Sequence, residues 1–203
     1  MDAVKHMVGM SKENYESAAA IEKALRNVRI EMMRGVFGNI EAHLKDRLEP
    51  IDHYQSHCVR FYKKPHRRTY PSLNFVLARI NGFRVCLRFQ VDWNLFYGVF
   101  FTTDDDEWSW LPKEAQKVKD AFSDEAWKQM IQTHRGKDWL VWWRYLPDNE
   151  NLLDFRGFSG AYTELYDAEG YNRIMQAIYN EIDENIESIL KTGLPNDSER
   201  VER

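Results

Sequence analysis

Residues 83–93 read FRVCLRFQVDW, and apolar side chains alternate with mostly polar ones along the whole stretch. Successive side chains of a strand point to opposite faces, so the pattern predicts a strand with one apolar and one polar face. The apolar run 73–80 precedes it, separated only by Asn81 and Gly82. An Asn-Gly pair between two such runs predicts a hairpin, because both central residues of a type I′ turn need positive φ. We expect a sheet built around this hairpin, with helices on its apolar face and the polar face open.

The composition is that of a globular chain, since 43% of the 203 residues are hydrophobic and 30% are charged. This length fits one domain, or one domain with an appendage. We expect residues 1–10 to be a flexible N-terminus, 11–193 a single domain and 194–203 a disordered tail. The net charge of −4 is unlike that of a dedicated nucleic-acid binder, so such a role would need a local basic patch.

Three features of the chain predict a cytoplasmic protein. Cys58 and Cys86 are too few for a disulfide framework in a chain of this length, so we expect two reduced thiols. No apolar run approaches the roughly 20 residues that span a bilayer. Asp2, Lys5 and His6 interrupt the N-terminal stretch where a signal peptide would have its apolar core, and we expect no membrane partner.

Helical periodicity predicts one helix at 11–27 and a second at 28–48, with apolar residues every four positions in the second. Gly35 and Gly38 in the second helix indicate either a close approach of another element or a bend. A last helix with an isoleucine stripe begins near its cap, Asp167. The other expected elements are strands at 59–62, 73–80, 83–93, 95–102 and 138–146, and short helices at 112–122 and after Ser123.

These elements predict an α+β fold. We expect an antiparallel sheet of about five strands, with the N-terminal helices and a long C-terminal helix packed on one face.

The short motifs of phosphate binding and hydrolysis are missing: GxxxxGK[ST], GxGxxG, GxSxG and HExxH do not occur. His53 and His57 stand four residues apart beside Cys58, a spacing that could hold a metal ion on a helix. However, Pro50 lies just before them and an expected strand follows, which favours a polar connection. We therefore predict no catalytic residue, no metal site and no cofactor.

The most basic part of the chain follows the strand expected at 59–62. Its candidate binding residues are Tyr62, Lys63, Lys64, Arg67, Arg68 and Tyr70. Clustered cations neutralise phosphates and tyrosine rings stack on bases, so nucleic acid is one candidate partner. The alternative is a solvated loop between two strands. Arg84 and Arg88, on the polar face of the neighbouring strand, could extend the loop into one positive surface, or pair with acidic groups of a covering helix or a protein partner.

Tryptophans gather around the second half of the expected sheet and predict an aromatic core there. In the strand at 138–146, Trp139 and Trp143 share one face and Trp142 lies on the other. If that other face is open, Trp142 is a candidate anchor for a protein partner, because large aromatic residues dominate binding hot spots.

Several segments occur in an order that resembles a known family. RFQVDWNLFYG at 88–98 is followed by WLVWWRYL at 139–146, NLLDF at 151–155 and the terminal isoleucine-rich helix. Over roughly residues 20–190, the chain resembles the C-terminal half of certain uncharacterised bacterial and phage-associated proteins of the PD-(D/E)XK nuclease superfamily.

The resemblance implies that a preceding nuclease domain would carry the acidic residues and the lysine that bind metal and activate water. This chain has no Glu-x-Lys or Asp-x-Lys, and the nearest analogue, Gln90-Val91-Asp92, lacks the lysine. Because metal-dependent phosphodiester hydrolysis needs several convergent carboxylates, no catalytic residue of the family carries over.

We therefore expect a non-catalytic binding or accessory module of a bacterial or phage nucleic-acid-related, defence-type system. It would act through the open sheet face and the basic loop, on a protein in preference to nucleic acid alone. One alternative is a divergent metal-dependent nuclease-like enzyme with Asp92 as a metal ligand. Another is a self-associating structural protein, a homo-oligomer that uses Trp142 and the sheet edge.

Overall fold

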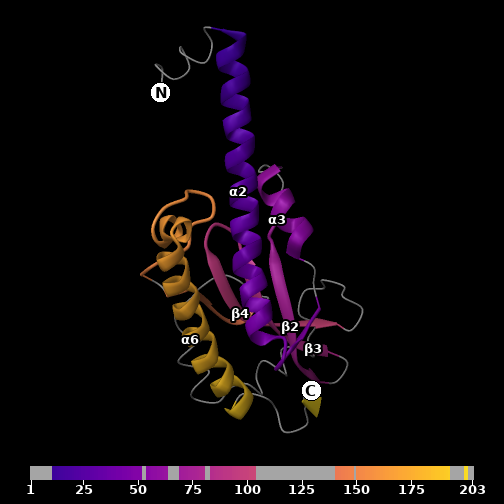
Figure 1. Ribbon diagram of the computed structural model, residues 1–203. Coiled ribbons are helices and arrows are strands. Elements are labelled where there is room, and N and C mark those ends of the chain that lie inside the picture. Colours follow the sequence, from indigo (N-terminus) through magenta and orange to yellow (C-terminus); the bar gives the residue numbers. More distant parts are fainter. Residues whose placement is uncertain are drawn as a thin grey trace.

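The computed structural model describes residues 11–51, 54–63, 69–80, 83–103, 140–148, 150–192 and 199–200. Its elements are α2 (Lys12–Leu44), β1 (Glu49–Pro50), α3 (Tyr54–Lys63), β2 (Ser72–Ile80), β3 (Phe83–Val91), β4 (Leu95–Thr103), β5 (Leu140–Tyr145), the 3-10 helix η1 (Ala161–Tyr166), α6 (Ala168–Thr192) and β6 (Glu199–Arg200). The helices lie on one side of an antiparallel sheet (Figure 1), which confirms the predicted α+β fold.

The sheet is built around the predicted β2–β3 pair. Its described strands have the order β1-β2-β3-β4-β5, and β6 also pairs with β2. In the β2–β3 ladder, Phe75 lies opposite Leu87 and Ile80 lies opposite Phe83. β3 pairs with β4 along its entire length. The strands expected at 73–80, 83–93 and 95–102 are confirmed to within three residues at each end.

Other predictions for the sheet fall partly or wholly outside the described residues. The Asn81–Gly82 turn and the helices at 112–122 and after Ser123 lie outside them, and the strand expected at 138–146 is present as β5. Glu199 and Arg200 belong to the tail that was predicted to be disordered, but they form β6 and pair with β2.

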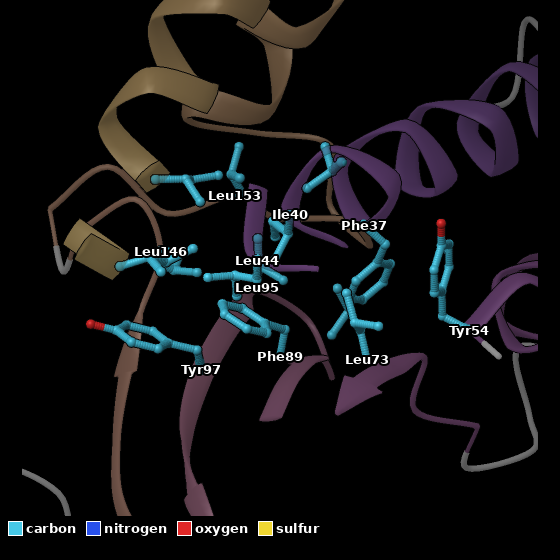
Figure 2. Close-up of a cluster of buried hydrophobic side chains, with 14 of the residues drawn as sticks. Phe37, Ile40, Leu44, Tyr54, Leu73, Phe89, Leu95, Tyr97, Leu146 and Leu153 are labelled. Carbon is cyan, nitrogen blue, oxygen red and sulfur yellow. The ribbon is translucent and has the colours of Figure 1, made fainter. Parts of the chain in front are cut away.

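The main core lies between the helices and the apolar face of the sheet (Figure 2). Phe89 of β3 stacks on Tyr97 of β4 with 5.7 Å between ring centroids, and it meets Phe75 of β2 edge-on at 6.0 Å. The second half of α2 covers these rings. Its buried residues are Ile30, Met33, Val36, Phe37, Ile40 and Leu44. The alternation thus does place Val85, Leu87, Phe89 and Val91 in the core under the helices.

The opposite face of the sheet is not open, and that prediction was wrong. Arg84 is only 9% exposed and Arg88 only 4% exposed. Between them lies Cys86, which forms a second apolar cluster with Phe96 and Phe100. These apolar neighbours explain the error, because they make burial of the second face favourable and the long aliphatic part of arginine tolerates burial.

The N-terminal part of the chain forms one helix, α2, and not the two that were predicted. Ser11 is the N-cap, as expected, and its hydroxyl accepts a hydrogen bond from the Asn14 backbone N–H at 3.1 Å. The predicted break near Asn27 was wrong because neither proline nor glycine stands there to interrupt the helix. The helix continues to Leu44.

Gly35 and Gly38 of α2 allow two other helices to come close, which was one of the two predicted alternatives. A Cβ atom at Gly35 would lie 3.1 Å from the hydroxyl of Tyr171 on α6, and one at Gly38 would lie 3.2 Å from the hydroxyl of Tyr54 on α3. The missing side chains therefore position α6 and α3 against α2.

Residues 54–63 form α3, so the strand predicted at 59–62 was wrong. The buried residues Tyr54, Cys58 and Phe61 recur at i, i+4 and i+7, the pattern of an amphipathic helix. Packing of that face against α2 and the sheet outweighs the strand preference of Val59 and its aromatic neighbours.

The predicted C-terminal helix is confirmed as α6. The Asp167 carboxylate accepts a hydrogen bond from the Gly170 backbone N–H at 2.9 Å, which caps the helix as expected. Its isoleucine stripe is buried against the core at Ile174, Ile178, Ile182 and Ile186.

Two leucines on α2 provide a direct test of this packing. Leu44 is fully buried, whereas Leu25 is 45% exposed. We expect Leu44→Ala to lower the free energy of unfolding by about 2–5 kcal/mol. Leu25→Ala, the matched control, should change it by no more than about 0.5 kcal/mol. Urea unfolding of dilute protein measures both, and equal losses would contradict the packing described.

Candidate functional site: an apolar stripe on the α2 arm

The first half of α2 projects beyond the rest of the described chain (Figure 1). We call residues 12–28 the arm. Among residues 11–29, only Ala18, Arg26 and Arg29 are even partly buried. The arm is helical because it is rich in alanine, is capped by Ser11 and continues into a half of α2 that the core holds in place.

Large apolar side chains are exposed along the arm. Of the seven exposed large hydrophobic residues in the described part of the chain, four lie there. They are Tyr15, Ile21, Leu25 and Val28, exposed by 66%, 61%, 45% and 47%. Three of them continue a 3-4-3-4 spacing through Ala18, Ile21, Leu25, Val28 and Met32. That spacing puts the side chains on one face of a helix, so the arm carries an apolar stripe.

The stripe continues into the contact between α2 and α6. Met32 packs against the core, and Gly35 lies against Tyr171 of α6. Asn39, seven residues after Met32, donates a hydrogen bond to the Tyr171 hydroxyl at 2.9 Å. Residues at this spacing share one helix face. The face of α2 that packs against α6 in the body is therefore the face that carries the exposed stripe on the arm.

The charged residues of the arm balance each other. Lys12 lies 3.6 Å from Glu16, and Arg26 pairs with Glu22, both at i,i+4 spacing. Such exposed pairs add only a few tenths of a kcal/mol each to a helix. The apolar stripe is therefore not surrounded by charge of one sign.

An aromatic contact marks where the arm leaves the body. The Arg29 guanidinium carbon lies 3.6 Å from the ring centroid of Phe158, a cation–π contact. Phe158 also packs against Tyr162 of η1, at 5.4 Å between ring centroids. The arm, residues 12–28, lies immediately N-terminal to this contact.

Asp154 organises the loop that presents Phe158. Its Oδ1 accepts hydrogen bonds from the backbone N–H groups of Arg156 and Gly157, at 3.0 and 2.6 Å. Its Oδ2 accepts one from the Ser159 hydroxyl at 2.9 Å. Phe158 has a φ of 57°, a left-handed conformation that bulky residues rarely adopt. The loop therefore holds this ring in place at a cost in backbone strain.

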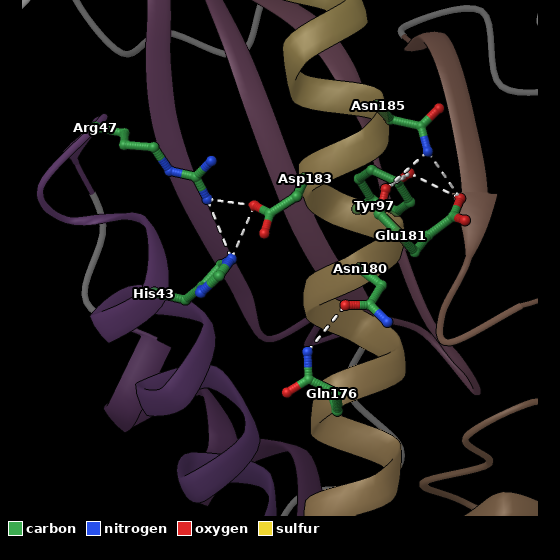
Figure 3. A network of polar contacts seen from close by, with 8 residues as sticks. All are labelled: His43, Arg47, Tyr97, Gln176, Asn180, Glu181, Asp183 and Asn185. Carbon is green, nitrogen blue, oxygen red and sulfur yellow. Dashed lines mark hydrogen bonds and ion pairs between the residues drawn. The ribbon is translucent and has the colours of Figure 1, made fainter.

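A polar cluster joins the lower part of α2 to α6 (Figure 3). Oδ1 of Asp183 lies 2.9 Å from His43 Nε2 and 2.5 Å from a guanidinium nitrogen of Arg47. The same two nitrogens are 3.1 Å apart. A carboxylate only accepts and a guanidinium only donates, so the arrangement is satisfied when both nitrogens donate to Asp183. The His43 ring also stacks on Tyr179 of α6, at 4.3 Å.

Ionisation of Asp183 follows from these contacts. Partial burial disfavours its charged form, but the hydrogen bonds from Arg47 and His43 outweigh that effect. The pKa of Asp183 therefore lies below its ordinary value of 3.8.

A second polar cluster joins α6 to the sheet (Figure 3). Glu181 Oε1 accepts a hydrogen bond from the buried Tyr97 hydroxyl at 3.0 Å and lies 2.9 Å from Arg144 of β5. Burial raises the pKa of Glu181, although Arg144 opposes the rise. Burial also raises the pKa of Tyr97 well above 10, so its hydroxyl stays a donor. Together the two clusters hold α6 against the sheet and against the half of α2 from which the arm projects.

The predicted basic site is only partly described. Lys64, Arg67 and Arg68 lie outside the described residues. Lys63 and Tyr70 are exposed, but Tyr62 is half-buried and its hydroxyl donates to the Phe155 carbonyl at 3.1 Å. The structure thus does not show these residues as one surface, and nucleic-acid contact here stays a prediction.

The remaining predicted site residues do not form an exposed surface in the described part of the chain. Arg84 and Arg88 are buried, with Arg88 5.3 Å from the Phe100 ring centroid. Trp142 pairs with Val99 in the β4–β5 ladder, and its side chain is not among those described. Its role as an anchor stays a prediction. Trp93, expected in an aromatic core, is exposed instead.

No three metal-ligating side chains converge among the described residues. His57 lies on α3, and His53 lies outside the described residues. Cys58 and Cys86 are buried thiols, and burial raises the pKa of Cys58 to about 12, so it is protonated at neutral pH. Asp92 accepts a hydrogen bond from the Trp93 backbone N–H at 2.5 Å.

Comparison with known proteins gives no relative: no protein-family model, no curated protein and no solved structure matches the chain. The resemblance to the PD-(D/E)XK superfamily therefore stays a prediction. Within the described part of the chain, no helix combines the length and apolarity that a membrane crossing requires.

Sequence reasoning missed the arm as a surface, although its signal was present. The helix predicted at 11–27 has its apolar positions at Tyr15, Ala18, Ile21 and Leu25. The prediction that the N-terminal helices pack on the sheet is wrong for this part, because periodicity identifies an apolar face without saying what covers it.

The link between α2 and α6 can be tested through pH. The lowered pKa of Asp183 means that its stabilisation is present above the ordinary value near 3.8 and is lost as pH falls through the folded-state pKa. We expect Asp183→Asn to reduce stability at pH 7 by about 0.5–1 kcal/mol, since the carboxylate is partly solvent-screened. The difference from wild type should shrink as pH falls below 3.8 and vanish only below the lowered folded-state pKa of Asp183.

Asp46→Asn is the matched control, since Asp46 is exposed in the turn that follows α2. Urea midpoints are measured for both variants over the same acid-to-neutral pH range, and the loss of stability at pH 7 should be smaller for this variant. A pH-independent loss for Asp183→Asn would show that its charge plays no part.

Proposed function

We propose that the protein is a non-catalytic binding module that docks another protein through the apolar stripe of the α2 arm. The observation that carries the proposal is the exposure of Ile21, Leu25 and Val28 on a projecting helix. Single exposed apolar residues are common on protein surfaces, but several aligned on one element mark an interaction surface.

The energetics of an isolated helix support the proposal. Helices of about 12–15 residues or fewer are marginal in water without tertiary packing. The arm is little longer than this and receives almost no packing from its own body. Burial of one large aliphatic side chain contributes about 1.5–3 kcal/mol. A partner that covers Ile21, Leu25 and Val28 would therefore gain affinity and stabilise the arm.

The docking surface differs from the one that the sequence suggested. The second sheet face is buried at Arg84 and Arg88, so the proposal does not use it. An accessory role in a nucleic-acid-related, defence-type system rests on the family resemblance alone. The proposal that the protein is a binding module rests on the exposed apolar stripe of the arm.

Charge substitutions on opposite faces of the arm test the proposal. In the stripe variant, Ile21→Lys with Leu25→Lys, two lysines replace apolar side chains that a partner would cover. The matched control is Ala20→Lys with Asn27→Lys, since both residues are exposed and lie on the side of the helix away from the stripe. Both variants add the same charge, and circular dichroism should show the same helix content.

The measurement is the size of the native complex that each tagged chain forms in the cells that make it. We expect the wild type and the control to form the same complex in equal amounts. The amount formed by the stripe variant should be at least ten-fold lower. Equal complexes for all three chains, or no complex for any of them, would refute the proposal.

A further inference from the structure

We infer that the second face of the sheet holds a binding site for the base of a free nucleotide. Four polar side chains form the centre of this site, and we call them the polar quartet. They are Ser72 and Asn74 of β2 and Arg88 and Gln90 of β3. The α2 arm contributes nothing to the site, so the binding proposed for the arm is a separate function.

The members of the polar quartet are neighbours on one face. Ser72 lies directly opposite Gln90 in the β2–β3 ladder, and Asn74 lies directly opposite Arg88. Directly opposite residues, and residues two positions apart on one strand, share a face of the sheet. Phe89, between Arg88 and Gln90, belongs to the main core. The quartet therefore lies on the face away from the helices, which are together on one side of the sheet (Figure 1).

Within the described part of the chain, three members of the quartet are buried without a hydrogen-bond partner. Ser72 is 5% exposed, Asn74 2% and Gln90 5%. Their side chains make no hydrogen bond there, and Oδ1 of Asn74 is itself buried. Buried polar side chains almost always have a partner, because the loss of their bonds to water costs free energy. Three neighbouring exceptions therefore point to one ligand that contacts all of them.

The chemistry of the quartet requires a ligand that both donates and accepts hydrogen bonds. The amides of Asn74 and Gln90 each present a donor beside an acceptor, and the Ser72 hydroxyl can do either. Arg88 only donates, and its positive charge disfavours a metal ion. A phosphate or carboxylate alone only accepts, so it would leave the amide oxygens unpaired. A nucleobase carries donors and acceptors along one edge, and Asn and Gln amides pair with such edges through two bonds.

Beside the quartet, the sheet offers a surface for a planar ring. Gly98 of β4 lies directly opposite Arg88, and Trp143 of β5 lies directly opposite Gly98. No side chain therefore stands between Arg88 and Trp143 in this row, and a glycine inside a strand often marks the close approach of a ligand. Phe96, opposite Gln90, meets Trp143 with 5.6 Å between ring centroids. Aromatic side chains of this kind stack on nucleobases.

Burial and charge favour a free nucleotide over a base within a polymer. The three members without a partner are at most 5% exposed, so a base that contacts them is enclosed. A small ligand fits such a site, whereas a polymer must leave it on both sides of the bound base. Trp143 and Tyr145 are half-buried, so the face meets solvent at β5. Arg84 and Arg88 share the face and suit the negative charge of a phosphate.

Binding to the purified full chain is the first test. Isothermal titration with AMP, GMP, CMP and UMP determines which base is bound, and ribose 5-phosphate, which lacks a base, is the control. We expect at least one of the four nucleotides to bind with a dissociation constant below about 1 mM, and ribose 5-phosphate to bind about ten-fold more weakly or less. The same nucleotide should raise the melting temperature in proportion to the logarithm of its concentration.

Two substitutions in the quartet are the second test. Asn74→Leu replaces the buried amide by an apolar side chain that branches in the same way, and Ser72→Ala removes one oxygen atom. Each should weaken binding of that nucleotide by about ten-fold. Without nucleotide, Ser72→Ala should not lower the melting temperature, because a buried hydroxyl without a partner adds no stability. Asn180→Leu, at an exposed position of α6, is the matched control and should leave binding unchanged.

Four results would overturn the inference. The first is no binding of any of the four nucleotides at about 1 mM. The second is equal binding of nucleotide and ribose 5-phosphate, which would mean that only the phosphate is recognised. The third is wild-type binding by Ser72→Ala and by folded Asn74→Leu, since the nucleotide would then be held elsewhere. The fourth is binding of a single-stranded RNA of mixed sequence in preference to every free nucleotide.

Discussion

The structure depends on the packing of one half of α2 against the sheet. Phe37, Ile40 and Leu44 cover the aromatic face that β2, β3 and β4 present, and they do so without solvent exposure (Figure 2). Packing, and not helix propensity, supplies most of the stability of helices in proteins. Because α2 is continuous, this packing also fixes the direction of the arm. The arm is therefore held by the core at one end only.

This arrangement explains where an interaction surface can arise. The two polar clusters around Asp183 and Glu181 hold α6 against α2 and against the sheet. α6 therefore covers the stripe-bearing face of α2 only beside the body. Beyond the contact between Arg29 and Phe158, whose backbone has a positive φ, the same face continues on the arm as an exposed apolar stripe. A partner with an apolar face would cover the stripe on the arm in the way that α6 covers the same face of α2 beside the body.

Much of this fold follows from the sequence, because side-chain periodicity reports burial directly. The alternation in 83–93 predicted β3. In 73–80 apolar residues stand at both parities, a pattern typical of a strand covered on both faces, and it agrees with the burial of Arg84 and Arg88 on the neighbouring strand. The helix α3 was missed because local strand preference at 59–62 hid the spacing of Tyr54, Cys58 and Phe61. The arm was missed because an apolar stripe looks the same whether it packs within its own chain or against another.

Hydrogen exchange along α2 tests the central claim most directly, because it reports the local stability of each turn. In dilute protein, we predict slow exchange for the backbone amides of 33–44 and rapid exchange for those of 14–28. Strong protection of the whole helix at every concentration would contradict the account, since it would mean that the arm is held within its own chain.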